Sequence, residues 1–455
     1  MIDVLGPTVV LHDHLDGGVR PATLIELAAV AGVALPADHP DRLGEWLTIR
    51  PSMPFAEAFS RFDLVVACLQ TPEALRRVTA EAVEDLAADG VIHAELRFAP
   101  LLHTAGALTP DEAVETVVRA LADAASSTMS TGLILCALRP DDPRSSTAVA
   151  ELGVRHAGVV GFDLAGAEAG YPAGPHADAF ARAAEGGLGR TVHTGEMDGV
   201  EAVLETLEAC HPDRLGHGWR LIDDCRVVDG RIVELGPVAA RVRDAGIPLE
   251  VCLTSNACLG LAVEDHPVRL LVDAGFRVCL NPDDRSITTT STSREHRLAA
   301  EVHGFDRVEL AAAAERAAVA AFLPEAERRE LVTRVRDGWD VEPRRLVHLA
   351  EWSRWEAVRG HGVYLPAEWD QDGFIHLSAR HQLLTPANHL YRGRTDLVAL
   401  ELDVSLLGHA VVWEPGTGTD EHFPHLYSAL SADAVVAEHP MVPAADGGFL
   451  LPAGL

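Results

Sequence analysis

The chain has 455 residues, more than one compact domain of common size holds, so we expect two domains, one of them large. It carries 68 acidic and 37 basic residues, and the resulting net charge of −31 repels nucleic-acid phosphates and anionic lipid. Every basic residue is an arginine, which excludes Schiff-base and other lysine chemistry. Nucleic acid and a membrane surface are therefore not expected among its partners.

The seven cysteines never take CxxC spacing, and their odd number is typical of free thiols in a reducing compartment. No signal-like segment opens the sequence, and no run of about 18 uncharged apolar residues follows. We expect a soluble protein of the cytoplasm.

Short apolar runs that favour strands recur between longer segments with helix-type apolar spacing. The runs cover residues 8–14, 91–98, 132–138, 159–165, 190–194, 214–217, 248–252 and 276–281, and the helical segments include 72–88, 110–125, 177–185, 200–210 and 238–245. Strands that alternate with helices form a parallel sheet, and eight of them predict a closed (β/α)8 TIM barrel of the α/β class. An open doubly wound sheet is the alternative. It favours a glycine-rich phosphate loop after the first strand, where this chain has His12 and His14 instead.

An additional segment, residues 37–69, separates the first predicted strand from the next regular helix. Phe55, Phe59 and Phe62 recur in it at helical spacing. These rings could line a pocket for a planar ligand beneath a lid, although such a stripe more often packs in a core.

The composition changes beyond residue 338. Five of the seven tryptophans lie there, and no cysteine does. A helical region over about residues 295–338 precedes the change, and short strands and turns with one or two helices follow it, without a βα period. We predict a barrel over residues 1–338 and a small α+β domain over residues 339–455.

The ends of the predicted strands carry candidate metal ligands. Alternate residues of a strand point to the same face, so His12 and His14 present two imidazoles together. Barrel enzymes place their chemistry at the carboxyl ends of strands, and His193 and Asp283 lie at the ends of two later strands. Nitrogen and oxygen ligands with one position left for water suit a catalytic zinc ion, which lowers the pKa of that water toward ~7. We therefore predict one Zn²⁺ held by His12, His14, His193 and Asp283.

Two further groups at strand ends are suited to proton transfer. Glu196 lies three residues after His193, and His217 ends the next predicted strand, so different surroundings would divide acid and base roles between them. Taken singly, each residue at these strand ends is compatible with a structural role. A histidine could simply be a hydrogen-bonded structural residue, and Asp283 and Asp284 could cap the following helix. Their convergence at four strand ends favours a catalytic site.

Seven segments occur in the order and approximate spacing of the adenosine deaminase family, over about residues 5–335. They are LHDHLDGGVRP, HAELRFAP, GFDLAGAEAG, TVHTGE, DRLGHG, EVCLTSN and LNPDDRS. The resemblance implies a (β/α)8 barrel with one zinc ion that hydrolyses the 6-amino group of adenosine or 2′-deoxyadenosine. The products are inosine or deoxyinosine and ammonia, and the role is purine salvage.

Position by position, the resemblance implies the same four zinc ligands, makes Glu196 the acid that protonates purine N1, and makes His217 the residue that orients the attacking water. It also implies that Asp284 contacts N7, that the backbone of Gly166 meets N3, and that Asp16 holds a ribose hydroxyl. Attack at C6 builds negative charge in the ring, so an acid at N1 is also required chemically. The H-x-E and P-C-x-x-C pattern of cytidine-deaminase-type zinc sites is absent.

The sequence departs from the family at two places. Pro282 stands where threonine is common, and a proline fixes φ beside a predicted ligand, while residues 257–266 are short and apolar for the family. One alternative is therefore a deaminase of another 6-aminopurine compound, such as adenine or an aminofutalosine nucleoside. Another is a purine-binding sensor without turnover, in which Pro282 displaces Asp283. Intact Glu196 and His217 favour an enzyme, because a sensor has no use for an acid at N1.

The C-terminal part resembles a small bacterial family of unknown function over about residues 345–455. The resemblance rests on GFIHLS, YRGRTDL and FPHLY, at residues 373–378, 391–397 and 423–427. That family is similar in fold to ADP-ribosyltransferase-like domains, an analogy that implies no activity by itself. Here His376, Ser378, Glu414 and His425 are polar residues in apolar surroundings, which could line a pocket or be satisfied structural groups.

Overall fold

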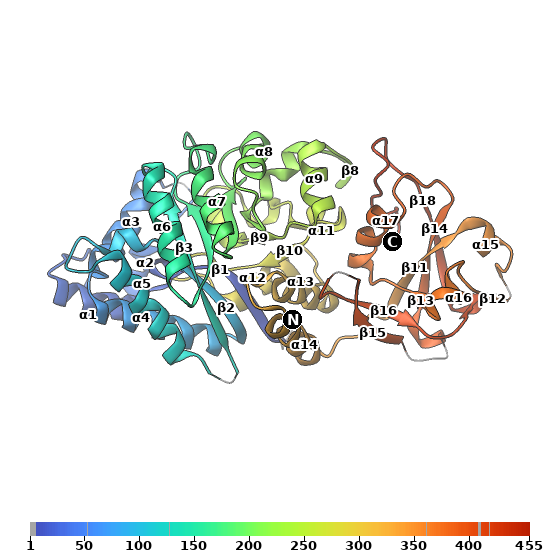
Figure 1. Cartoon of the computed structure of the whole chain (residues 1–455), viewed down its shortest axis with the longest axis horizontal. Coiled ribbons are helices and arrows are strands. Elements are labelled where there is room, and N and C mark those ends of the chain that lie inside the picture. The colour runs from blue at the N-terminus through green and yellow to red at the C-terminus, as the bar shows by residue number, and fades with distance from the viewer. Residues whose placement is uncertain (1–5, 52, 127, 361, 408–410, 418) are drawn as a thin grey trace.

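The computed structural model describes residues 6–51, 53–126, 128–360, 362–407, 411–417 and 419–455. Figure 1 shows a large helix-covered barrel, coloured from blue to brown, and a smaller domain of strands and short helices in orange and red. The side chain of Phe55 lies outside the described part of the chain.

Eight parallel strands form one sheet in the order β1-β2-β3-β4-β5-β6-β9-β10. They are β1 (Thr8–His14), β2 (Val91–Phe98), β3 (Ser130–Leu138), β4 (Val159–Ala165), β5 (Gly189–Thr194), β6 (Arg214–His217), β9 (Leu249–Val251) and β10 (Val278–Leu280). A parallel bridge between Asp13 and Asp283 joins the first strand to the last. Beside it, the Asn281 side-chain oxygen accepts the backbone N–H groups of Leu11 and His12 at 2.8 and 3.1 Å. The sheet is thus a nearly closed barrel, and the predicted TIM-barrel fold is confirmed.

Helices cover the outside of the barrel. They are α1 (Pro21–Ala31), α2 (Pro40–Leu47), α3 (Phe55–Cys68), α4 (Pro72–Ala88), α5 (Pro110–Ala124), α6 (Pro143–Arg155), α7 (Ala177–Glu185), α8 (Val200–Ala209), α9 (Pro237–Ala245), α10 (Leu253–Cys258), α11 (Val268–Asp273), α12 (Thr292–Glu301), α13 (Arg307–Ala320) and α14 (Glu325–Trp339). Sequence signals set several of the starts: Thr109 and Glu112 form a capping box at α5, and proline occupies the first position of α4. One buried apolar cluster packs helices on β1 to β5, and a second packs α13 and α14 on β6, β9 and β10.

One hairpin, β7 (Cys225–Val228) with β8 (Arg231–Leu235), was not among the predicted strands. Its turn is Asp229-Gly230, and both residues have positive φ, 49° and 71°. An Asp-Gly pair between apolar residues is a strong hairpin signal, because these two residue types tolerate that backbone. The signal is present in the sequence, but the hairpin lies outside the alternation of strands and helices on which the strand predictions rest.

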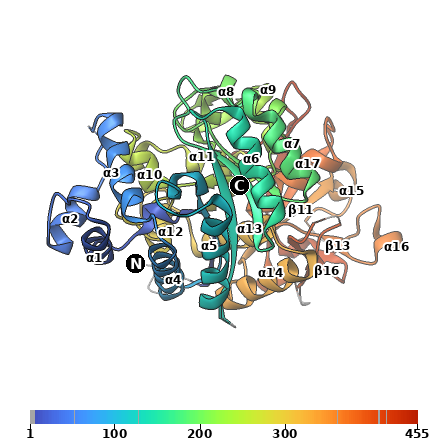
Figure 2. The same ribbon diagram turned by 60° about the vertical axis from the view of Figure 1, so that its left-hand side comes forward.

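The additional segment after β1 forms α2 and α3. Figure 2 shows α1, α2 and α3 together at one edge of the barrel, far from the C-terminal domain. Among the described residues, no helix is long and apolar enough to cross a membrane.

The C-terminal domain is built on small antiparallel sheets, β11-β14-β18, β13-β16-β15 and β12-β17. The strands are β11 (Arg345–Glu351), β12 (Val363–Tyr364), β13 (Ile375–His376), β14 (Leu397–Asp403), β15 (Val411–Pro415), β16 (His422–Leu426), β17 (Leu430–Ser431) and β18 (Val435–Met441). Three short helices accompany them, α15 (Trp352–Glu356), α16 (Trp369–Asp372) and α17 (Leu384–Leu390). The domain has its own buried core around Trp355 and Leu400.

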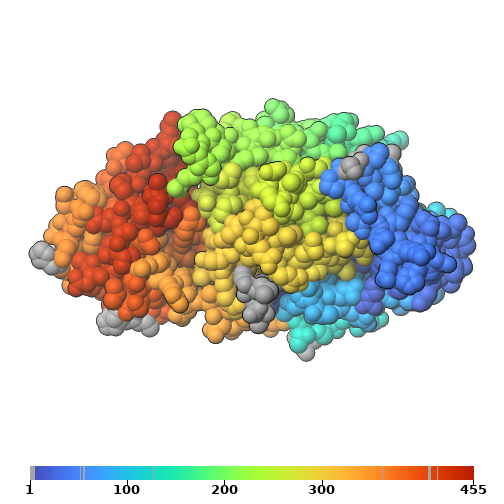
Figure 3. All heavy atoms as spheres, turned by 180° about the vertical axis from the view of Figure 1, so that it is seen from behind, coloured from blue at the N-terminus to red at the C-terminus, as the bar shows by residue number. Residues whose placement is uncertain are grey.

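The C-terminal domain packs against the end of the barrel at which the strands begin, and Figure 3 shows its red segments in contact with the green and yellow ones. Arg328 of α14 donates to Asp420 at 2.6 Å, and Arg380 pairs with Asp273, just before β10, at 3.0 Å. Trp339, the last residue of α14, belongs to the barrel core. The carboxyl ends of the strands therefore stay free for a site.

Candidate active site and metal centre

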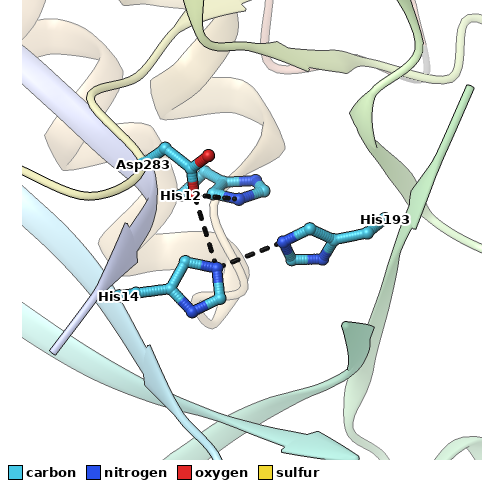
Figure 4. Close-up of side chains that lie close together, drawn as sticks. All are labelled: His12, His14, His193 and Asp283. Carbon is cyan, nitrogen blue, oxygen red and sulfur yellow. Dashed lines mark hydrogen bonds and ion pairs between the residues drawn. The ribbon is translucent and has the colours of Figure 1, made fainter. Parts of the chain in front are cut away.

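Four of the predicted residues converge at the carboxyl ends of β1, β5 and β10 (Figure 4). His14 Nε2 lies 3.1 Å from His193 Nε2. The Asp283 carboxylate places Oδ1 3.0 Å from His12 Nε2 and 3.4 Å from His14 Nε2. The ligand atoms of all four residues lie within 4.8 Å of one another. His12, His14, His193 and Asp283 thus form a candidate metal site.

The donor set fits a divalent metal ion. His12 Nε2 is buried and makes no hydrogen bond among the described residues, because the ring proton is on Nδ1 and the nearest polar atom, Asp283 Oδ1 at 3.0 Å, is also an acceptor. Two buried acceptors at this distance are costly unless another group binds them both. Burial holds the pKa of His14 well below its usual value and also lowers the pKa of His193. Neutral imidazoles are the form that binds metals, and three nitrogens with one carboxylate oxygen suit zinc.

A layer of buried charges beneath the site orients two of the histidines. His12 Nδ1–H donates to Glu250 at 2.8 Å, and His193 Nδ1–H donates to Asp163 at 3.1 Å. Arg97 joins these two carboxylates, donating to Asp163 at 2.8 Å and to Glu250 at 2.9 Å. A carboxylate behind a metal-binding histidine fixes the tautomer, so that Nε2 faces the metal.

The charge state of this layer follows from its arginines. Burial alone would raise the pKa of Glu250, but Arg97 and Arg214 hold it well below its usual range. Burial likewise opposes ionisation of Asp163, which His193 and Arg97 overcome. Both carboxylates are therefore ionised and act only as acceptors.

Pro282 does not displace Asp283. The residues on either side of it keep their backbone bonds, because Asn281 N–H donates to Val251 and Asp283 N–H donates to His12. Asp283 has a φ of 65°, in the left-handed region that aspartate tolerates better than most residues. The proline lies where the barrel needs no donor, so the expected disturbance is not found.

Glu196 and His217 lie beside the candidate metal site. His217 Nε2 is 3.3 Å from Glu196 Oε1 and 3.9 Å from Asp283 Oδ2. Burial raises the pKa of Glu196 to about 8, and the charges of Asp283 and Glu168 add to the effect. This shift favours the protonated form of Glu196 at neutral pH.

A chain of hydrogen bonds fixes the tautomer of His217. Val268 N–H donates to His266 Nδ1, so His266 Nε2–H must donate to Asn256 Oδ1. The Asn256 amide N–H then donates to His217 Nδ1 at 3.2 Å. His217 consequently carries its proton on Nε2, the atom that faces Glu196 and the metal site.

Glu168 holds the turn that carries Glu196. Its buried carboxylate accepts Thr194 Oγ1–H and four consecutive backbone N–H groups, at residues 195–198, over distances of 2.7 to 3.1 Å. A buried carboxylate with this many donors fixes the position of the segment it binds.

A cavity of about 540 Å³ lies over these residues. Its lining includes Asp16, Gly166 and Asp284, the three predicted substrate contacts, together with His14, His193, Glu196, His217 and Asp283. Phe59 and Phe62 of α3 line its outer part, with ring centres 5.9 Å apart. The size is in the range of small-molecule sites, and the cavity combines an apolar wall with a few polar groups.

Asp284 is prepared to donate a hydrogen bond. Burial and the neighbouring charges of Asp283 and Asp16 raise the pKa of Asp284 well above its usual value. Its Oδ1 has no hydrogen-bond partner within the described chain. Gly17 allows this placement, because a Cβ there would lie 1.9 Å from Asp284 Oδ1.

Sequence reasoning did not identify Glu250, Asp163, Arg97, Glu168 or Asn256 as functional. Charged residues within otherwise apolar strands were the available signal for the first three, because a buried charge is costly unless it is paired. The roles of Glu168 and Asn256 depend on partners far along the chain, which spacing does not reveal.

The polar residues singled out in the C-terminal domain gather only in part. His425 Nδ1–H donates to Glu414 at 2.8 Å, Tyr427 donates to the same carboxylate at 2.6 Å, and Phe374 stacks on His425. His376 lies with its ring 5.1 Å from that of His425. Ser378 is buried, and its backbone pairs with Val347.

Comparisons with known proteins found relatives of both parts of the chain. Residues 7–338 match the family described as adenosine deaminase, and residues 349–438 match a family described as a protein of unknown function, DUF952. The adenosine deaminase of Mycobacterium marinum is 40% identical over 341 residues, 72% of this chain and 94% of that protein. Among solved structures, an adenine deaminase from Arthrobacter aurescens has a TM-score of 0.66 at 28% identity, covering 73% of this chain and 98% of that chain. The N6-methyl-AMP deaminase from Arabidopsis thaliana has a TM-score of 0.62 at 26% identity, covering 73% and 96%.

Proposed function

Because the chain belongs to the adenosine deaminase family, we propose that its barrel hydrolyses the 6-amino group of adenosine or 2′-deoxyadenosine, in purine salvage. The products are inosine or deoxyinosine and ammonia. The observation that carries the proposal is the position of Glu196 in a cavity of about 540 Å³, beside the cluster of three histidines and Asp283. We place the activity in the cytoplasm, where the free thiols of this chain remain reduced.

We propose that His12, His14, His193 and Asp283 hold one Zn²⁺ ion. Bound there, zinc supplies Lewis acidity that makes water a nucleophile near neutral pH. Glu250 and Asp163 keep the first and third of these histidines oriented through their Nδ1 atoms.

Glu196 protonates purine N1 as water attacks C6. The ring accepts negative charge during the attack, and the proton that the carboxylic acid gives to N1 neutralises it. Of the two protons that the water loses, one passes to the 6-amino group, which leaves as ammonia, and the other restores the carboxylic acid of Glu196. His217 donates its Nε2–H to the oxygen of the attacking water and so aims it at C6. Glu168 holds the backbone of Glu196 in place throughout.

The substrate contacts follow from the states of the lining residues. Asp284, protonated, donates to N7, which is an acceptor. The backbone of Gly166 meets N3, and Asp16 accepts from a ribose hydroxyl. These contacts select a purine, and the last one favours a nucleoside over a free base.

Another 6-aminopurine is the second candidate substrate, because the solved structures similar to this barrel include an adenine deaminase and an N6-methyl-AMP deaminase. Adenine would fill less of the cavity than a nucleoside, and an aminofutalosine nucleoside would fill more of it.

The test is amine release by the zinc-loaded full-length protein, measured in parallel as ammonia from adenosine, 2′-deoxyadenosine and adenine and as methylamine from N6-methyl-AMP. We expect the two nucleosides to have the highest kcat/KM. An Asp16→Asn variant should raise KM for the nucleosides and leave any turnover of adenine unchanged. A preference for adenine, or no turnover of any of the four by protein with one zinc per chain, would contradict the proposal.

We also propose the division into residues 1–338 and 339–455. Its support is the short connection between α14 and β11, which begins at Arg345, although Trp339, the last residue of α14, packs in the barrel core.

A further inference from the structure

A second cavity, of about 300 Å³, lies where the barrel meets the C-terminal domain. Arg214, Pro248 and Arg277 line it, at or just before the first residues of β6, β9 and β10. The end of α13 lines a second side, and Glu421 lines it from the C-terminal domain. The cavity therefore lies at the opposite end of the barrel from the proposed active site.

Arg316 of α13 faces this cavity with only 9% of its surface exposed. One Nη–H group donates to the backbone carbonyl of His381 at 3.0 Å. Within the described chain, no carboxylate lies within 4.0 Å of its guanidinium. Burial lowers the pKa of Arg316, and the charge of Arg277 adds to this effect, while the more distant carboxylates of Glu421, Glu315 and Glu309 offset it only in part. A buried guanidinium without a paired anion costs free energy, which a bound anion would recover.

Arg277 is the second incompletely paired cation. Its nearest carboxylate oxygen, Glu421 Oε2, is 3.7 Å away, beyond hydrogen-bond distance. Glu421 also accepts from Gln382 through its other oxygen at 3.2 Å. Two guanidinium groups thus share one distant carboxylate.

The other charges around the cavity are paired elsewhere. Arg328 binds Asp420, and Asp213 binds Arg190 at 2.9 Å. Arg214 donates to Glu95 and Glu250, at 2.7 and 2.6 Å. The cavity therefore retains an excess of positive charge in a chain whose net charge is −31.

We propose that this cavity binds a small dianion of the phosphate or dicarboxylate class between Arg277 and Arg316. Guanidinium groups bind such oxyanions through paired N–H donors, and the interaction is strongest where water is excluded. Glu421 competes with the anion for Arg277. Because the cavity is lined by both domains, the bound anion stabilises their contact, and the unfolding temperature rises with its concentration.

The experiment measures the unfolding temperature of the full-length, zinc-loaded protein against inorganic phosphate, sulfate or succinate, with chloride keeping the ionic strength constant. Isothermal titration with the same anions gives Kd, and its value for phosphate or sulfate against succinate tells the two classes apart. We expect a concentration-dependent rise for the wild type. Arg316→Gln should abolish this rise and weaken Kd about ten-fold or more. Glu421→Gln should strengthen Kd, because it removes the competing carboxylate.

Arg119→Gln is the matched control, since Arg119 is an exposed arginine of α5 whose side chain is 74% accessible. Its response to anions should equal that of the wild type. If Arg316→Gln does not fold, Arg277→Gln carries the same test. The proposal is overturned if no anion raises the unfolding temperature of the wild type, or if Arg316→Gln, or Arg277→Gln in its place, responds as the wild type does. A variant that responds as the wild type does would also show that the anion binds at another place, such as the metal site.

Discussion

At the scale of single residues, the interior of this barrel is held together by paired charges. Glu250 accepts hydrogen bonds from His12, Arg97, Thr191 and Arg214, all of them buried. Each charge would be unfavourable alone, but Arg97 pairs with both Glu250 and Asp163, and Arg214 pairs with Glu250. Burying these charges costs free energy, but it fixes the orientation of histidines at the candidate metal site.

Arg97→Met tests this network, because methionine keeps much of the length and removes the charge. Glu250 and Asp163 would lose their shared partner, so the free energy of unfolding should fall by about 3 to 5 kcal/mol. Zinc affinity should fall about 10- to 100-fold, since both carboxylates orient histidines. Urea unfolding and competitive metal titration measure the two effects. Arg76→Met, on the exposed side of α4, is the control, and equal effects of both substitutions would contradict the account.

Glu168 offers a second test at this scale. Glutamine in its place accepts fewer backbone N–H groups, and it also removes a negative charge that raises the pKa of Glu196. The acid must be protonated to act, so kcat/KM falls as pH rises through the pKa of Glu196. In Glu168→Gln this alkaline fall should move to lower pH, with kcat reduced about ten-fold or more. A pH–rate profile with an unchanged alkaline limb would show that Glu168 has no influence on the acid.

At the scale of elements, the strands could be predicted closely because parallel barrel strands are short, continuous apolar runs. The bounds of β1, β2, β4 and β6 are those expected from the sequence. The strand ends then predicted which side chains meet. What closes the barrel could not be predicted, because the Asn281 side chain replaces part of the ladder between β10 and β1.

The residues that would bind the metal could be predicted from the sequence, whereas the residues that hold the site in place could not. The spacing of His12 and His14 indicates in the sequence that they act together, whereas His266 is connected to His217 only through Asn256. Such a chain depends on where α10 and the following turn are placed. The sequence shows that His217, Asn256 and His266 are polar, but it does not show which of them are hydrogen-bonded to one another.

His348 of β11 makes the stability of the C-terminal domain depend on pH. Its Nδ1–H donates to the carbonyl of His376, Tyr364 donates to its Nε2, and burial lowers its pKa to about 4. Unfolding restores a pKa of about 6.5, so the unfolded chain binds an extra proton between these values. The C-terminal domain should lose stability as pH falls from 6.5 to 4, by an amount on the order of 3 kcal/mol.

His348→Gln should reduce this pH dependence, measured as tryptophan fluorescence during urea unfolding at several pH values. His389→Gln, at an exposed position of α17, should keep the wild-type slope. The same slope in all three proteins would mean that His348 is not buried in its neutral form.

At the scale of the whole molecule, two domains share an interface rich in arginine at the end of the barrel away from the proposed chemistry. Asp420 accepts from Arg328 and Arg329, at 2.6 and 3.0 Å, and is itself buried. The residues that stabilise the interface are therefore separate from the residues that would act on the substrate.

Asp420→Asn should therefore lower the unfolding free energy by about 1 to 3 kcal/mol, because two arginines lose a charged acceptor. Deaminase kcat and KM should stay at wild-type values, since the substrate cavity lies at the other end of the barrel. Calorimetry and steady-state kinetics on the same preparation measure both. A large fall in kcat with intact zinc content would indicate coupling between the two ends.

The most direct test of the central claim is adenosine deamination by Glu196→Gln, measured as kcat together with zinc content and inosine affinity. Glutamine keeps the shape of the side chain but cannot supply an acidic proton to N1. The account predicts that kcat falls about 100- to 10,000-fold, with one zinc per chain and inosine binding retained. Turnover by the variant at a rate close to the wild type would contradict it, because Glu196 would then not be the acid of this site.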